Sequence, residues 1–97
     1  MQPFEANVPS LRERRLAELK QPFEDGLNRR ISGFGLEATV ETDVTAGGLY
    51  AVVSETASGG PLPVHLRKKV IAKSREIAPN DQYGGFDVYI LARAREE

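Results

Sequence analysis

The chain has 97 residues, 40% hydrophobic and 28% charged, which is enough for one small domain with a modest core. Its 13 Lys and Arg against 14 Asp and Glu give a net charge of -1, which argues against a dedicated nucleic-acid binder, because such proteins usually carry a clear basic excess. The absence of cysteine excludes disulfides and thiolate chemistry, and without a membrane-length apolar run or a secretory signal we expect a cytoplasmic protein that contacts no membrane.

The first predicted element is a helix that begins after Ser10. Ser10 is a typical N-cap, and Glu13 three residues later completes a capping box. Apolar residues then recur every three or four positions, as on one helix face: Leu16, Leu19, Phe23, Leu27 and Ile31. Because Pro22 lacks an N–H and crowds the preceding turn, we expect two helical pieces or one bent rod, ending at Gly33.

Two strands joined by a short turn are predicted next. In residues 34–44 the side chains alternate, and one side carries Phe34, Leu36, Ala38, Val40, Thr42 and Val44. The letters "TAGG" indicate a turn, and "LYAVVSETA" (49–57) predicts the hairpin partner. A second helix is expected from about Pro63 to Ala78, because Pro79 stops it. After the turn-rich stretch "APNDQYGG", the letters "FDVYILARA" (86–94) predict a last strand.

The order of these elements is helix, strand, strand, helix, strand. It predicts an α+β fold in which residues 1–97 form a single two-layer sandwich, with the helices on one face of an antiparallel-rich sheet. Residues 2–8 alternate weakly (Phe4, Ala6, Val8) and could add an edge strand at the start. With that strand the order becomes β-α-β-β-α-β, the ferredoxin-like arrangement; without it the sandwich is open and three-stranded.

The second helix contains a strongly basic stretch, "LRKKVIAKSRE" (66–76), with five positive charges: Arg67, Lys68, Lys69, Lys73 and Arg75. One interpretation is the solvent side of a core helix. The other is an electrostatic contact surface for a nucleic acid or an acidic protein. No aromatic residue is interleaved, so stacking on single-stranded bases is not indicated. Lysine outnumbers arginine, which favours diffuse phosphate or protein contact over readout of bases.

Four blocks of the chain resemble, in order, blocks of the ribonuclease P protein subunit: "RRISG" (Arg29–Gly33), "AVVSE" (Ala51–Glu55), "RKKVIAKSRE" (Arg67–Glu76) and "FDVYILAR" (Phe86–Arg93). The resemblance implies RNA contact through Arg67, Lys69 and Arg75. Glu55 and Thr56 stand where that family has a basic pair. A second stretch, "REIAPNDQYGG", is similar to a turn of phage neck and tail-completion proteins, which implies assembly in a phage or mobile element.

Residues suited to catalysis or metal binding are scarce. His65 is the only histidine, and with no cysteine there is no pair of ligands for a transition metal. Glu41 and Asp43 share one strand face, but the pattern directs both to solvent, whereas acid–base pairs need carboxylates in unlike environments. We therefore expect no catalytic residues, no metal, no cofactor and no enzymatic activity.

The sheet face away from the helices carries apolar residues that a monomer would not need. By parity the outward positions include Tyr50, Val52, Tyr89 and Leu91, which indicates a protein-contact surface. Our leading hypothesis is a non-enzymatic protein-binding module, such as an adaptor, an inhibitor or an assembly subunit. Its partner would be another protein or a second copy in a homo-oligomer. The alternative is an RNA- or DNA-binding protein that uses residues 66–76.

Overall fold

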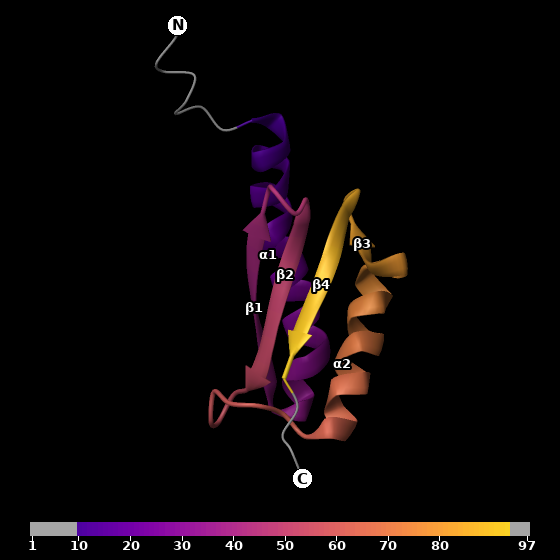
Figure 1. Ribbon diagram of the computed structural model, residues 1–97. Coiled ribbons are helices and arrows are strands. Elements are labelled where there is room, and N and C mark those ends of the chain that lie inside the picture. The colour runs from indigo at the N-terminus through magenta and orange to yellow at the C-terminus, as the bar shows by residue number, and fades with distance from the viewer. Residues whose placement is uncertain (1–9, 94–97) are drawn as a thin grey trace, which may run out of the picture.

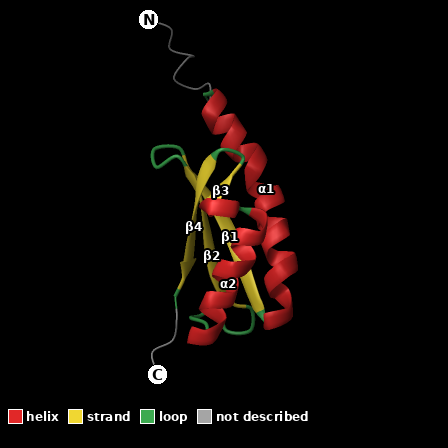
Figure 2. Cartoon of the chain, turned by 90° about the vertical axis from the view of Figure 1, so that its right-hand side faces the viewer, coloured by secondary structure: helices red, strands yellow, loops and turns green. Residues whose placement is uncertain are grey.

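The computed structural model describes residues 10–93 and has an α+β fold. The elements are α1 (Leu11–Ile31), β1 (Leu36–Asp43), β2 (Gly48–Glu55), α2 (Val64–Ile77), β3 (Gln82–Tyr83) and β4 (Phe86–Ala92). Both helices lie on one face of a single four-stranded sheet (Figures 1 and 2). The other face, called the open face below, is not covered by any described residue. The strand considered for residues 2–8 lies outside the described residues.

The sheet is mixed, with strand order β1-β2-β4-β3. β1 and β2 are antiparallel, β4 and β3 are antiparallel, and β2 and β4 are parallel neighbours joined by α2. A ferredoxin-like sheet separates the two strands of each such unit by another strand. The direct pairing of β2 with β4 therefore leaves a ferredoxin-like arrangement unconfirmed.

The stretch "APNDQYGG" is more ordered than the predicted loop, because it contains β3. Gly84 (φ 59°) and Gly85 (φ 88°) form the two-residue turn that joins β3 to β4. Positive φ at both central residues is the requirement of a tight hairpin turn, which glycine meets without strain. The short strand β3 was not predicted because two residues are too few to show alternation.

Helix α1 is one continuous helix with Pro22 inside it, so of the two alternatives the two separate pieces are excluded and a single rod is found. Its start is as predicted, since the Glu13 N–H donates to the Ser10 Oγ at 3.1 Å. Pro22 is exposed inside the helix, so the carbonyl that loses its partner faces solvent. The burial of one apolar stripe outweighs that loss: Leu16, Phe23, Leu27 and Ile31.

The core lies between the helices and the inner face of the sheet. It contains the inward residues of β1, β2 and β4, one residue of α2 and the residue that follows α2: Leu36, Ala38, Val40, Leu49, Ala51, Val53, Val70, Ala78, Phe86, Val88 and Ala92. The predicted inner face of the first strand was too long at both ends. Phe34 lies in a short 3-10 turn, where Gly35 (φ 75°) separates it from β1. At the far end Thr42 and Val44 are exposed.

Two strands, β2 and β4, end earlier than the sequence pattern predicted. β2 ends at Glu55, where the Gly59 N–H donates to the Glu55 carbonyl at 2.7 Å and turns the chain. β4 ends at Ala92, and residue 94 of the predicted strand lies outside the described residues. Within residues 10–93, neither helix is long and apolar enough to cross a membrane.

Side chains of α1 close the outer edge of β1. Asn28 donates through Nδ2 to the Ala38 carbonyl at 3.0 Å and accepts from the Ala38 N–H through Oδ1 at 2.8 Å. Glu24 accepts from the Val40 N–H at 2.8 Å. These contacts supply hydrogen bonds that a neighbouring strand would otherwise make. The edge of β1 is thus partly satisfied within the chain.

Candidate functional site: the open sheet face and the edge of β4

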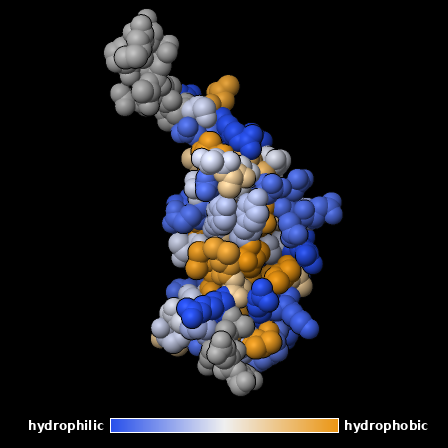
Figure 3. Space-filling view, viewed as in Figure 1, coloured by the Kyte–Doolittle hydropathy of each residue, from blue (hydrophilic) through white to orange (hydrophobic). Residues whose placement is uncertain are grey.

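Four apolar side chains form a contiguous group on the open face, which we call the sheet-face patch: Tyr50, Val52, Tyr89 and Leu91. Alternation along the strands directs all four outward, and the parallel register pairs Tyr50 with Tyr89 and Val52 with Leu91. Val52 is 46% exposed, Tyr89 38% and Leu91 51%. Figure 3 shows hydrophobic side chains gathered near the middle of this face, with charged ones around them. The four predicted contact residues are therefore neighbours in space.

The two tyrosine rings stack on each other across the β2–β4 pair. Their rings stack with centroids 4.8 Å apart and planes 19° from parallel. Gly48 makes room for this arrangement, since a Cβ there would lie 2.7 Å from the Tyr89 ring and 2.7 Å from the Asp87 carbonyl. Desolvation, followed by the charge of Asp43 and the interaction with Tyr89, raises the pKa of Tyr50. The patch thus presents a stacked aromatic surface.

Carboxylates border the end of the patch nearest the β1–β2 turn. Asp43 and Asp87 are the cross-strand neighbours of Gly48, and Glu41 is opposite Tyr50. Negative charge beside the stacked rings repels phosphate. This border argues against the aromatic pair serving as a platform for single-stranded bases, which normally lies in a positive groove.

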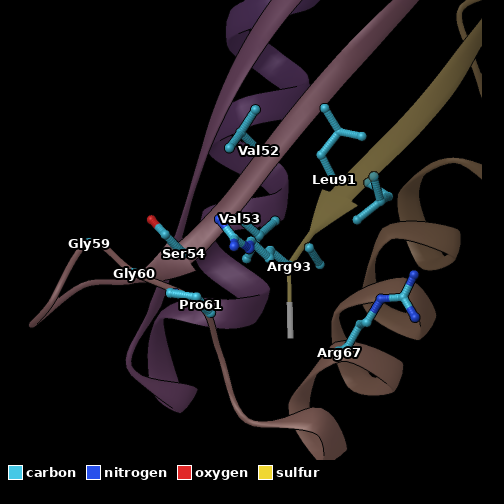
Figure 4. Close-up of a pocket in the computed structure, with 11 residues that line it drawn as sticks. Val52, Val53, Ser54, Gly59, Gly60, Pro61, Arg67, Leu91 and Arg93 are labelled. Atoms are coloured by element: carbon cyan, nitrogen blue, oxygen red, sulfur yellow. The ribbon is translucent and has the colours of Figure 1, made fainter. Parts of the chain in front are cut away.

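The other end of the patch continues into a groove of about 490 Å³. Val52 and Leu91 form one part of its lining, and Pro61 and Arg67 come from the segment that leads into α2 and from α2 itself (Figure 4). Arg93 also lines it. The sequence did not identify Arg93 or the groove, because the lining residues are distant in sequence and meet only through the β2–β4 pairing.

The five cations of residues 66–76 do not form one surface. Lys69 lies over the Phe34 ring, with Nζ 5.3 Å from the centroid. Lys73 pairs with Glu76 at 3.2 Å, and Arg75 pairs with Asp81 at 3.3 Å.

The two cations left, Arg67 and Lys68, have no ion-pair partner among the described residues. Arg67 lines the groove and Lys68 is exposed. The contact through Lys73, followed by that of Arg30, lowers the pKa of Glu76. Three of the five cations are therefore used in local contacts, Arg67 lines the groove, and Lys68 is exposed.

Within residues 10–93, no cluster of three or more His, Asp or Glu is suited to hold a metal ion. His65 is exposed in the first turn of α2.

Comparisons of the chain with models of protein families, with curated proteins and with solved structures gave no match.

Proposed function

We propose that this chain is a non-enzymatic protein-binding module that contacts its partner through the sheet-face patch. The observation that carries the proposal is the contiguity of Tyr50, Val52, Tyr89 and Leu91 on the face that the helices leave open. An apolar group bordered by charge is typical of the centre and rim of a protein interface. The roles of adaptor, inhibitor and assembly subunit are all compatible with such a surface.

The test compares two patch variants with a matched control. Leu91→Lys and Tyr89→Lys place a charge inside the patch, whereas Val64→Lys places one at an equally exposed apolar residue (49%) on α2. Because a charge at the centre of an interface removes a hot spot, we expect the patch variants to weaken binding at least tenfold. The Val64→Lys variant is expected to bind normally, and all three should melt near the wild-type temperature.

Partners are to be captured from an extract of the source cells and quantified by mass spectrometry, with light scattering as the measure of self-association. Proteins retained by the wild type and by Val64→Lys, but lost from both patch variants, would support the proposal. A monomer whose captured proteins are the same for all four chains would refute it.

Nucleic-acid binding is the second candidate. The observation in its favour is that Arg67 and Lys68 lack acidic partners among the described residues. Two cations are few for a binding surface, because phosphate neutralisation supplies most of the affinity for nucleic acid.

A further inference from the structure

The two edges of the sheet differ in how the backbone groups of their outer strands find hydrogen-bond partners. The edge of β1 is closed by Asn28 and Glu24, as described above. On the opposite side, β3 covers only the first two residues of β4, since the pairs are Gln82–Asp87 and Tyr83–Phe86. From residue 88 to residue 92, β4 has a neighbouring strand on one side only, counting the described residues.

The direction of the backbone groups of β4 follows from one hydrogen bond. The Asp87 N–H donates to the Gly47 carbonyl at 3.4 Å, so it points toward β2. Successive residues of a strand present their N–H and C=O groups to alternate sides. Tyr89 and Leu91 therefore bond to β2, whereas Ile90 and Ala92 present theirs to the free edge. Their side chains point to the helix layer.

Residues 88–92 of β4 carry no lysine, proline or bulge, the features within a strand that usually protect an edge. Exposed edges are normally blocked by lysine, proline, a bulge or a covering element. The sequence from residue 88 to residue 92 is "VYILA", which contains no charge and no proline. It is made mostly of residues that favour strands. An edge of this composition is suited to pair with another strand.

Helix α2 lies beside this edge of the sheet (Figure 1). It lies on the side of β4 away from β2 (Figure 1), with only Val70 and Ser74 fully buried along its length. A second groove of about 310 Å³ runs between α2 and β4, and Ile71 and Ile90 line it. Both side chains are half-buried. An added strand would cover them.

From these observations we infer that the free edge of β4 binds an extended polypeptide segment by strand addition, and that this segment is apolar with an acidic end. Main-chain hydrogen bonds to Ile90 and Ala92 would supply affinity, and alternate side chains would enter the groove under α2. The acidic end follows from charge complementarity. Arg67 and Arg93 line the other groove, the one of about 490 Å³ that lies where β4 ends. Neither has an ion-pair partner among the described residues.

A second copy of the chain fits this edge less well than a single strand. Two copies joined antiparallel through β4 would carry their helices on the same face of the combined sheet. Because α2 extends beyond β4 (Figure 1) and a helix is about 10 Å across, the two copies of α2 would compete for the same space. A segment that brings no helix avoids this conflict.

The inference rests on the proposed function only in that both require protein partners. The binding elements differ, because the patch uses outward side chains and the edge uses backbone groups. The Leu91→Lys variant tests the patch. The edge is tested separately by a peptide.

The probe is the peptide EVTVTV, acetylated and amidated, added to the full-length chain. In the antiparallel orientation its valines oppose the edge residues and its glutamate lies near Arg93. Two control peptides are KVTVTV, which reverses the charge, and EVTVTV N-methylated at the fourth residue, which removes one backbone donor. Affinity is measured by titration and location by amide hydrogen exchange.

We expect the Ile90 amide of the free chain to exchange faster than those of Tyr89 and Leu91, and to slow when EVTVTV is added. Both control peptides should bind about tenfold more weakly, as expected for the loss of one hydrogen bond or ion pair. The Ala92→Pro variant should also lose binding, because proline removes an edge N–H without affecting the bonds to β2.

Several results would overturn the inference. One is an Ile90 amide already as protected as its neighbours in the free chain, which would mean that the edge is occupied. Equal affinity for the N-methylated peptide, or no slowing of the Ile90 amide at millimolar peptide, would exclude strand addition. A dimer that is lost in Ala92→Pro would assign the edge to a second copy. If Ala92→Pro does not fold, the comparison of EVTVTV with its N-methylated form still tests strand addition.

Discussion

The closed edge of β1 allows a quantitative test through Asn28. The substitution Asn28→Ala removes two hydrogen bonds, of 3.0 Å and 2.8 Å, to the backbone of Ala38. At about 1 kcal/mol for each bond, the loss is about 2 kcal/mol. Alanine favours the helix over asparagine by roughly 0.5 kcal/mol, which offsets part of the loss. The expected net change in the free energy of unfolding is therefore about 1.5 kcal/mol.

For a domain of this size, a loss of 1.5 kcal/mol corresponds to a fall in Tm of roughly 6–12 °C. Thermal melting followed by circular dichroism measures it. The control is Arg29→Ala, which changes the adjacent exposed residue and should alter Tm by no more than a few degrees. Amide exchange supplies a local reading, because the Ala38 N–H should exchange faster in Asn28→Ala, while the Val40 N–H remains held by Glu24.

An Asn28→Ala variant that melts with the Arg29→Ala control and keeps its Ala38 amide protected would contradict this expectation. That result would mean that water hydrogen-bonds to the backbone of Ala38 as well as Asn28 does. It would also weaken the contrast between the two sheet edges, on which the inference about β4 depends.

Two other outcomes are expected. Because Lys73 and, secondarily, Arg30 lower the pKa of Glu76, its stabilising contribution should be complete above pH 4.5 and be lost as the pH falls through the lowered value. A Glu76→Gln variant should show a smaller acid-side fall in Tm than the wild type, and parallel profiles would contradict this. For nucleic acid, gel shifts should show weak binding whose log affinity falls with log salt at a slope of about -2, from Arg67 and Lys68. Tight binding at physiological salt that is lost in Lys69→Glu would instead promote the nucleic-acid function.

Hydrophobic periodicity predicted those parts of the fold that depend on local sequence. The stripe from Leu16 to Ile31 marked the buried face of α1, and alternation placed Tyr89 and Leu91 on the opposite side of β4 from Val88. These assignments succeed because the period of a helix or a strand is fixed by backbone geometry. Pro22 left two alternatives open, because its cost depends on whether the carbonyl it leaves unpaired can reach solvent.

Features that depend on pairing between distant segments were not predictable from the pattern. Nothing local states that β2 lies parallel to β4, and the free edge and the groove exist only because of that pairing. Asn28 and Glu24 read as ordinary polar positions on the exposed side of a helix. Their function at the edge of β1 appears only when the strand is placed beside them.

The pairing of β4 with β2 separates the proposed patch and edge by parity. Odd-numbered residues of β4, such as Tyr89 and Leu91, contribute side chains to the patch and backbone bonds to β2. Even-numbered residues, such as Ile90, contribute side chains to the helix layer and backbone groups to the free edge. A partner that laid a strand on this edge would extend the open face by one strand, next to the patch. Both surfaces could then be used by one partner, and substitutions at odd and even positions would affect its binding for different physical reasons.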